Sequence, residues 1–263
     1  MKKTLNNKPE VVLASFPRSG NTFLRNILMD VFGVYSWNNI DVYHKALKKY
    51  QRLDRLRSIR TLPPGRLKKL HDLETRLGQR VIKTHDMPDR ILPKCAPGAK
   101  IIYLVRDGRD ALVSMAHHRK DIIAPGSDFQ GNLRDSIRAA GGSFFGGWGK
   151  NVSAWLQMDP LLIYFEMLVE DPGREILRIR DHLNLAEPDL SKIPTFETQR
   201  AGGSHFGGKN RDKLSKREQD EFNSKFFRSG KSGTWKQEMP PDIQETFWEK
   251  YGDVMLLMGY QKD

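Results

Sequence analysis

A group of hydrogen-bond donors follows the first apolar run of the sequence. Arg18, Ser19, Asn21 and Thr22 come shortly after Val11–Ala14, which has the composition of a buried strand. The apolar residues that follow recur at helical spacing, which predicts a helix beginning near Asn21. The first N–H groups of a helix have no partner within it, and the helix dipole favours an anion beside them. We therefore expect this loop to bind a phosphate or sulfate group.

The loop departs from the Walker A pattern of nucleotide-binding proteins. That pattern needs a glycine, four residues and then Gly-Lys-Ser/Thr. Here Gly20 is followed by Asn21 and Thr22, and the loop contains no lysine. An ordinary turn between a strand and a helix is the alternative for this loop taken alone.

A lysine and a histidine follow the second predicted strand. Gln79–Met87 is a short strand that runs into a loop, and Lys83 and His85 lie at its carboxyl end. Side chains alternate along a strand, so these two point to the same side if the strand extends that far. Ligands of open α/β sheets bind at this edge. His85 is therefore a candidate catalytic residue, and a structural histidine is the alternative.

An arginine and a serine mark a third position of the same kind. Lys100–Val105 is the clearest strand of the chain, and Arg106 follows it directly. The helix after this strand, Ala111–His118, carries Ser114. We expect a second anion site here, separate from the first loop. A salt bridge from Arg106 to Asp110 is the alternative.

Strands and helices alternate along the chain. Leu161–Phe165 is a fourth strand, and an amphipathic helix follows it to about Leu183. This alternation predicts an α/β fold with three layers, in which a doubly wound, mostly parallel sheet carries a phosphate-binding loop after its first strand. We expect one domain over residues 1–263. A last helix, 241–259, closes it with five residues directed inward: Ile243, Phe247, Trp248, Val254 and Leu257.

Composition restricts the class of protein. The 263 residues carry a net charge of +12 with a pI of about 9.7, which suits an anionic partner such as nucleic acid, a membrane surface or a small molecule. The single cysteine, Cys95, excludes an internal disulfide framework and fits a reducing compartment. We find neither a signal peptide nor an apolar run as long as a membrane span. The expectation is a cytoplasmic protein with no membrane span.

Three long segments lie outside the predicted core. Residues 43–78 form a basic, mostly helical excursion, either a solvated hairpin or a lid that attracts an anionic substrate; a DNA-binding patch is a further alternative. Residues 121–150 are irregular and rich in glycine, and the helical spacing of Trp148, Val152 and Trp155 at their end favours core packing over a ligand pocket. Residues 187–239 lose periodicity, and their Arg228–Lys231 run places cations around a flexible backbone that could clamp a phosphate.

Several stretches, in this order, resemble one enzyme family. They are SFPRSGNTF, VIKTH, IIYLVRDGRDALVS, GGWGKNVSAW, YFEMLVEDP and FFRSGKSGTWK. Together they resemble the sulfotransferases that use 3′-phosphoadenosine 5′-phosphosulfate (PAPS), over about residues 11–258. The resemblance implies transfer of a sulfonate group from PAPS to a hydroxyl or amine of a small-molecule acceptor, by in-line displacement and with no metal ion.

The resemblance also implies roles for individual residues. His85 would be the general base, and Arg18 and Lys83 would stabilise the leaving group and the sulfonate. The 5′-phosphosulfate and the adenine would contact the first loop and helix, through Arg18, Ser19, Gly20, Asn21, Thr22 and Phe23. The 3′-phosphate and the other side of the adenine would contact Arg106, Ser114, Phe196, Arg228, Ser229 and Gly230.

The sequence departs from the family pattern at five places. Arg18 and Ser229 stand where lysines are usual, Phe23 where many members have Trp, and Phe165 where Tyr is usual. Arg18 keeps its charge but does not give up a proton, because the pKa of arginine stays above about 12. Pro240-Pro241 interrupts the family's dimer motif, and proline has no N–H to donate. We expect a monomer, or a dimer that does not use this motif.

The sequence leaves the identity of the acceptor open, and two other functions remain as alternatives. The acceptor pocket is expected within residues 37–78 and 121–148, whose aromatic residues are Trp37, Tyr43, Phe129, Phe144, Phe145 and Trp148. A P-loop kinase or NTPase is the first alternative, although it would need the Walker A lysine and an acidic Mg²⁺ ligand. A nucleic-acid-binding protein is the second, and rests on charge alone. The expected partners are a small molecule and no nucleic acid.

Overall fold

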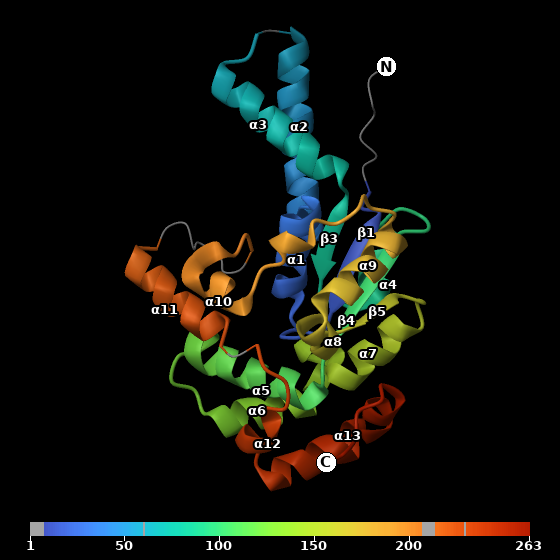
Figure 1. The fold of residues 1–263 in the computed structure, drawn as a ribbon, viewed down its shortest axis with the longest axis vertical. Coiled ribbons are helices and arrows are strands. Elements are labelled where there is room, and N and C mark those ends of the chain that lie inside the picture. The colour runs from blue at the N-terminus through green and yellow to red at the C-terminus, as the bar shows by residue number, and fades with distance from the viewer. Residues whose placement is uncertain (1–7, 60, 207–213, 229) are drawn as a thin grey trace.

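The computed structural model describes residues 8–59, 61–206, 214–228 and 230–263, and places one sheet at their centre. Its order is β2-β3-β1-β4-β5, and every neighbouring pair is parallel. The strands of the described ranges are β1 (Val11–Ser15), β2 (Ser36–Trp37), β3 (Val81–Thr84), β4 (Lys100–Val105) and β5 (Leu161–Tyr164). Helices lie on both sides of the sheet (Figure 1). The predicted α/β fold is confirmed, and β2 is a short edge strand that the sequence did not indicate.

Alternation along the central strands divides the core into two layers. On β4, Ile101, Tyr103 and Val105 are buried in one hydrophobic cluster, and Ile102 and Leu104 in the other. The second cluster packs under α1 (Asn21–Phe32), α8 (Phe165–Glu170) and α9 (Pro172–Leu183). The first packs under helices that include α5 (Gly108–His118), α7 (Trp148–Leu156) and α13 (Pro241–Leu257). A strand buried on both faces needs this continuous apolar sequence.

The loop between β1 and α1 requires a glycine where the helix begins. Gly20 precedes α1 with a φ of +93°, a conformation that residues with a side chain rarely adopt. A Cβ atom at this position would lie 2.3 Å from the ring of Phe165, which is also buried. The loop is therefore pressed against the segment that follows β5, and the N-terminus of α1 is fixed beside it.

The three central strands end at one edge of the sheet. Ala14 on β1 pairs with Thr84 on β3, and Ser15 pairs with Leu104 on β4. The residues that follow these strands therefore emerge next to one another. This register brings Arg18, His85 and Arg106 to a common edge, as expected for ligand-binding residues of an open α/β sheet.

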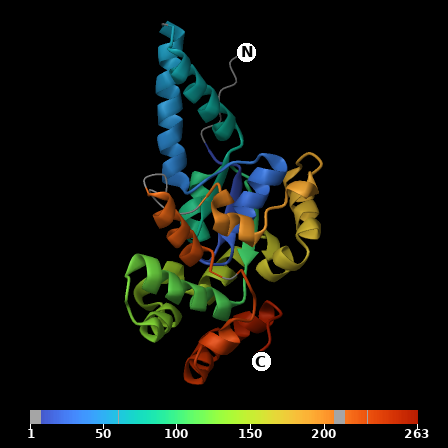
Figure 2. The same cartoon turned by 60° about the vertical axis from the view of Figure 1, so that its left-hand side comes forward.

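A helical hairpin projects from the body of the molecule. It consists of α2 (Ile40–Ile59) and α3 (Pro64–Gly78), and both views show it extending away from the sheet (Figures 1 and 2). The hairpin confirms the helical pattern of the basic segment. Its role as a lid stays a prediction.

Two segments that looked irregular contain helices. Asp128 accepts a hydrogen bond from the Gly131 N–H and starts α6 (Phe129–Arg138), within the segment 121–150. A capping box between Ser215 and Glu218 starts α11 (Lys216–Phe226), within the segment 187–239. Both starts are local capping signals that the glycine-rich surroundings obscured. The α-helices of four residues or fewer in the described ranges are α4 (Pro88–Ile91), α10 (Phe196–Thr198) and α12 (Trp235–Glu238).

The last helix matches its prediction except at one residue. Ile243 and Phe247 are buried on α13, but Leu257 is 71% exposed, so its predicted inward position is wrong. Tyr251 and Met255 are buried instead, at the spacing of the same helical face. Within the described ranges, no helix is long and apolar enough to cross a membrane.

Candidate active site

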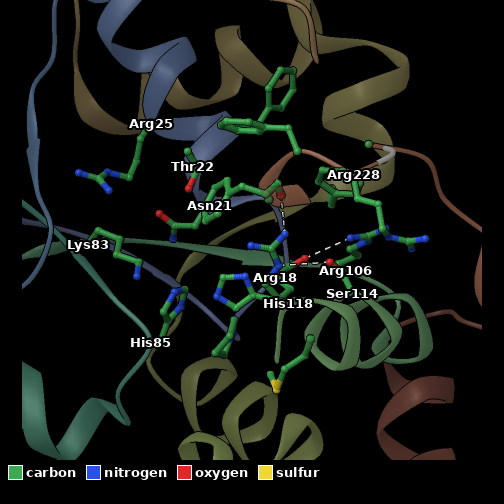
Figure 3. A pocket seen from close by; sticks show the side chains of 18 of the residues that line it. Arg18, Asn21, Thr22, Arg25, Lys83, His85, Arg106, Ser114, His118 and Arg228 are labelled. Atoms are coloured by element: carbon green, nitrogen blue, oxygen red, sulfur yellow. Dashed lines mark hydrogen bonds between the residues drawn. The ribbon is translucent and has the colours of Figure 1, made fainter. Parts of the chain in front are cut away.

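A cavity of about 820 Å³ lies at the carboxyl edge of the sheet. Figure 3 shows cationic and histidine side chains from segments far apart in the sequence gathered around it. Its cations are Arg18, Arg25, Lys83, Arg106 and Arg228, and its histidines are His85 and His118. Four arginines and a lysine line this cavity, and no carboxylate is among its described lining residues, so it attracts a multiply charged anion.

Arg18 sits on the phosphate loop with its side chain anchored at two points. Its Nε donates to the Ser114 hydroxyl at 3.2 Å, and its terminal nitrogen donates to the Phe226 carbonyl at 2.7 Å. Burial lowers its pKa to about 10, helped by the charges of Arg106 and Arg228, so the expected value above about 12 is too high. Arg18 is therefore still a cation at neutral pH. It joins the loop after β1 to helix α5 and to the end of α11.

His85 is held in one tautomer by the backbone of β1. Its Nδ1 lies 2.8 Å from the carbonyl oxygen of Ser15. A carbonyl oxygen only accepts, so Nδ1 carries the proton and Nε2 keeps its lone pair. Burial lowers the pKa of His85 well below its usual value, and the nearby charge of Lys83 adds to this effect. The imidazole is therefore neutral and able to accept a proton.

Lys83 lies beside His85 in an unusual environment. Burial lowers its pKa to about 7, and the charge of Arg25 adds to the shift while Asp86 opposes it. Arg25 itself donates to the Ser36 hydroxyl and carbonyl, both at 2.7 Å. Across the described ranges the amino group of Lys83 has neither a hydrogen bond nor an ion pair, so it is available to a ligand.

Arg106 connects the phosphate loop with the C-terminal segment. Its two terminal nitrogens donate to the carbonyls of Arg18 at 3.1 Å and Lys231 at 2.8 Å. Its guanidinium lies 4.6 Å from the centre of the Phe165 ring. The Asp110 carboxylate is 4.0 Å away, but its oxygens accept from the backbone of residues 233 and 235. The salt bridge proposed as the alternative therefore exists only as a long contact.

Two aromatic rings and a glycine form another part of the cavity wall. Phe23 and Phe196 stack with their ring centres 4.3 Å apart. Gly230 has a φ of +65°, and a Cβ there would lie 2.7 Å from the Phe196 ring. Arg228 donates to both carboxylate oxygens of Glu238, at 2.8 and 3.0 Å. Ser229, predicted to bind the 3′-phosphate, lies outside the described residues.

The structure brings together nearly all the residues that the sequence selected. Twelve of them line the cavity: Arg18, Gly20, Asn21, Thr22, Phe23, Lys83, His85, Arg106, Ser114, Phe196, Arg228 and Gly230. Ser19 is buried beneath it and is not among the lining residues. Among the described residues, no group of His, Cys, Asp and Glu side chains has the arrangement of a metal site.

Two cavity residues escaped the sequence analysis although helical spacing could have indicated them. Arg25 follows Asn21 by four positions on α1, and His118 follows Ser114 by four positions on α5. Residues four apart share a helix face. Burial lowers the pKa of His118 to about 4, with the charge of Arg18 adding to the shift.

The expected acceptor aromatics divide between the core and the cavity. Trp37, Tyr43 and Trp148 are buried in the hydrophobic core and do not line the cavity, so their predicted role is wrong. Phe145 does line it, with its ring centre 5.7 Å from that of His85. A large aromatic residue packs in the core as readily as in a binding site, because both environments bury apolar surface.

A parallel sheet with an anion-binding loop after its first strand, and cations at its carboxyl edge, defines an α/β protein that binds a phosphorylated or sulfated ligand. The sulfotransferase domain model matches residues 8–259. The chain therefore belongs to the sulfotransferase family, and the predicted PAPS-dependent sulfotransferase class is confirmed.

The curated relatives and the solved structures agree with this family. Cytosolic sulfotransferase 1 of Danio rerio is 28% identical over 261 residues, which cover 94% of this chain and 82% of that protein. Sulfotransferase 1B1 of Mus musculus is 29% identical, with coverage of 94% and 82%. The crystal structure of mouse sulfotransferase SULT7A1 complexed with PAP matches with a TM-score of 0.64 and 20% identity, over 95% of this chain and 84% of that one. Retinol dehydratase in a complex with retinol and PAP has a TM-score of 0.59 and 19% identity, over 94% and 82%.

Proposed function

We propose that the protein transfers the sulfonate group of PAPS to a hydroxyl or amine of a small-molecule acceptor, with His85 as the general base. The observation that carries this proposal is the 2.8 Å contact between the Nδ1 of His85 and the Ser15 carbonyl oxygen, from which the tautomer follows. Its Nδ1–H is engaged by Ser15, and its Nε2 lone pair is left for an acceptor in a cavity lined by cations. Family membership supports the reaction class.

The cavity fits the two charged ends of the proposed donor. At one end, the N-terminus of α1 and its loop suit the 5′-phosphosulfate. At the other, Arg106 and Arg228 suit the 3′-phosphate. The Nε of Arg106 and the hydroxyl of Ser19 are buried without a partner among the described residues. Buried polar groups are normally hydrogen-bonded, so these two atoms are consistent with ligand oxygens completing the site.

The base between these ends would be adenine. The stacked rings of Phe23 and Phe196 offer an aromatic surface against which it would pack. With ring centres 4.3 Å apart, the pair leaves no space for a third ring between them. Placement of adenine between the two rings, as the family resemblance implies, therefore requires Phe196 and its segment to move outward.

The residues around the acceptor would divide the chemistry. His85 accepts the proton of the nucleophile as the new bond to sulfur forms, and the bond from sulfur to the bridging oxygen breaks. Negative charge builds on that oxygen. Arg18, Lys83 and the helix N-terminus stabilise it, as fixed cations and dipoles do in phosphoryl transfer. General base catalysis of this kind contributes about 10²–10⁴-fold in rate.

Incubation with PAPS and a panel of phenols, alcohols, sugars and amines tests the proposal. The measured quantity is adenosine 3′,5′-bisphosphate released, separated by chromatography. We expect release that depends on one acceptor class and is nearly abolished in His85→Ala. Near-normal release by that variant, or failure of the wild-type protein to bind the bisphosphate, would contradict the proposal.

Three further predictions concern the protein's surroundings. A cytoplasmic location, a monomer or a dimer independent of Pro240-Pro241, and the absence of nucleic-acid binding stay predictions. Retention on DNA at moderate salt, unaffected by adenosine 3′,5′-bisphosphate, would contradict the last of them.

A further inference from the structure

A second cavity, of about 930 Å³, lies behind the wall of the first. It is bounded by the segment that follows His85, by the glycine-rich loop before α7 and by the outer face of α7. Phe145 lines both cavities. Because its ring also contacts the ring of His85, this side chain separates the proposed base from the second cavity.

Phe145 occupies a strained backbone position in a glycine-rich segment. Phe144 and Phe145 have φ values of +48° and +56°, which are rare for bulky residues. Glycines with positive φ flank them on both sides: Gly141, Gly142, Gly146 and Gly147. Strained residues persist where the surrounding structure holds them, and they concentrate at ligand-binding sites. Phe145 is 40% exposed, so its side chain is only partly enclosed by the surrounding structure.

The backbone of the wall is fixed to the catalytic segment by one buried amide. The Nδ2 of Asn151 lies 3.1 Å from the carbonyl of His85 and 3.3 Å from that of Phe145. Its Oδ1 accepts a hydrogen bond from the Tyr103 hydroxyl at 2.9 Å. Both Asn151 and Tyr103 are fully buried. The position of Phe145 relative to His85 is therefore set from the core, while its side chain faces the two cavities.

The lining of the second cavity suits an apolar chain. Its apolar members are Met87, Pro88, Leu92, Pro93, Phe144, Ala154 and Met158. The charged residues Asp86, Asp89, Arg90 and Lys150 also border it. A ligand chain would bury apolar surface against the first group and leave any polar end near the second.

We propose that the second cavity is a subsite for the acceptor. The acceptor is then an elongated amphipathic compound, whose hydroxyl or amine meets His85 and whose apolar chain passes Phe145 into the second cavity. This inference rests on the proposed sulfotransferase function, since that function defines which end of the acceptor meets His85.

A series of alkyl 4-hydroxybenzoates tests the proposal. The methyl, butyl and hexyl esters are titrated into the full-length protein by calorimetry, with and without saturating adenosine 3′,5′-bisphosphate. Each buried methylene strengthens binding, so we expect the dissociation constant to fall by on the order of tenfold or more from methyl to butyl. Met158→Trp, which fills the second cavity from its rim, should remove this gain and leave the methyl ester unaffected.

Leu256→Trp is the matched control, because Leu256 is an exposed residue of α13 that lines neither cavity. It should keep the full dependence on chain length. Phe145→Ala should increase the affinity for the hexyl ester, because the wall is removed. The subsite would be overturned if the affinity of the wild type did not rise with the length of the ester. It would also be overturned if the affinity of Met158→Trp rose as steeply as that of the wild type. If the wild-type protein does not bind adenosine 3′,5′-bisphosphate, the proposed function is contradicted. The titrations without the bisphosphate still test whether the second cavity binds the ester chain.

Discussion

The Nδ1 atom of His85 lies 2.8 Å from the carbonyl oxygen of Ser15, across the boundary between β3 and β1. The two strands are hydrogen-bonded neighbours, so this contact is set by the sheet itself. Asn21 donates to the Ser15 hydroxyl at 3.1 Å from the first turn of α1. The orientation of the imidazole and the start of the phosphate-binding helix are therefore tied to one residue of β1.

Removal of the imidazole should separate chemistry from nucleotide binding. In His85→Ala we expect kcat to fall by about 10²–10⁴-fold, the usual contribution of a general base. The dissociation constant for adenosine 3′,5′-bisphosphate should change less than twofold, since the nucleotide would contact other residues. Calorimetry and initial rates measure the two quantities. A loss of nucleotide affinity as large as the loss of rate would show that His85 has a binding role.

The lowered pKa of Lys83 predicts proton uptake when the nucleotide binds. With a pKa of about 7, Lys83 is mostly neutral at pH 8. A bound anion favours the charged form and raises this pKa, so the complex takes up a proton at pH 8. At pH 6 the amine is protonated before binding, and its contribution disappears.

Calorimetry in HEPES and in Tris at pH 8 measures this uptake, because the two buffers differ in their enthalpy of ionisation. The binding enthalpy of the wild type should depend on the buffer, and that of Lys83→Met should depend on it much less. Equal wild-type enthalpies in the two buffers would rule out a neutral Lys83 in the free protein.

The parts of the site that sequence reasoning found are those encoded in short continuous stretches. The apolar runs of the sequence and the points where they end predict the strand, loop and helix start within Val11–Arg25. They also predict which residues follow β3 and β4. Parallel pairing then brings the ends together, so His85 and Arg106 could be placed without coordinates.

The parts that were missed depend on packing between distant segments. Trp37 and Tyr43 were expected in an acceptor pocket because they are aromatic, but both are buried in the core beside the sheet. The neutral tautomer of His85 needs the Ser15 carbonyl, which lies 70 residues away in the sequence. The second cavity exists because the glycine-rich loop folds over Met87, and no spacing rule in either segment indicates this contact.

Arg18 should be replaceable by lysine and not by alanine. The guanidinium is a cation at neutral pH and bonds Ser114 and the Phe226 carbonyl. Arg18→Lys keeps the charge, and we expect kcat within about tenfold of the wild type. Arg18→Ala removes a stabilising donor, which typically costs about 10²–10³ in kcat. Steady-state kinetics with PAPS checks both, and equal activity of the two variants would contradict a role in charge stabilisation.

Two glycines of the C-terminal segment provide a matched test of the adenine end. Gly230 and Gly233 both have positive φ, so an alanine strains the backbone at each. A Cβ at Gly230 would lie 2.7 Å from the Phe196 ring, whereas no atom lies within 4 Å of one at Gly233. Gly230→Ala should weaken bisphosphate binding by at least about tenfold relative to Gly233→Ala, since an unrelieved clash costs more than 1.4 kcal/mol. Similar affinities in the two variants would mean that Phe196 does not contact the nucleotide.

The single phosphate that distinguishes adenosine 3′,5′-bisphosphate from AMP gives the sharpest test of Arg106. Its Nε is buried without a partner among the described residues, and its other nitrogens are bonded to two carbonyls. If a 3′-phosphate oxygen completes this set, the wild type should prefer the bisphosphate to AMP by a factor that Arg106→Ala largely removes. Hydrogen bonds to charged groups contribute about 1.5–3 kcal/mol, so the preference should fall by roughly 10- to 100-fold. Affinity for AMP is the internal control, and it should change little, because AMP has no 3′-phosphate. An equal loss for both ligands would show that Arg106 acts only by joining the phosphate loop to the C-terminal segment through the carbonyls of Arg18 and Lys231.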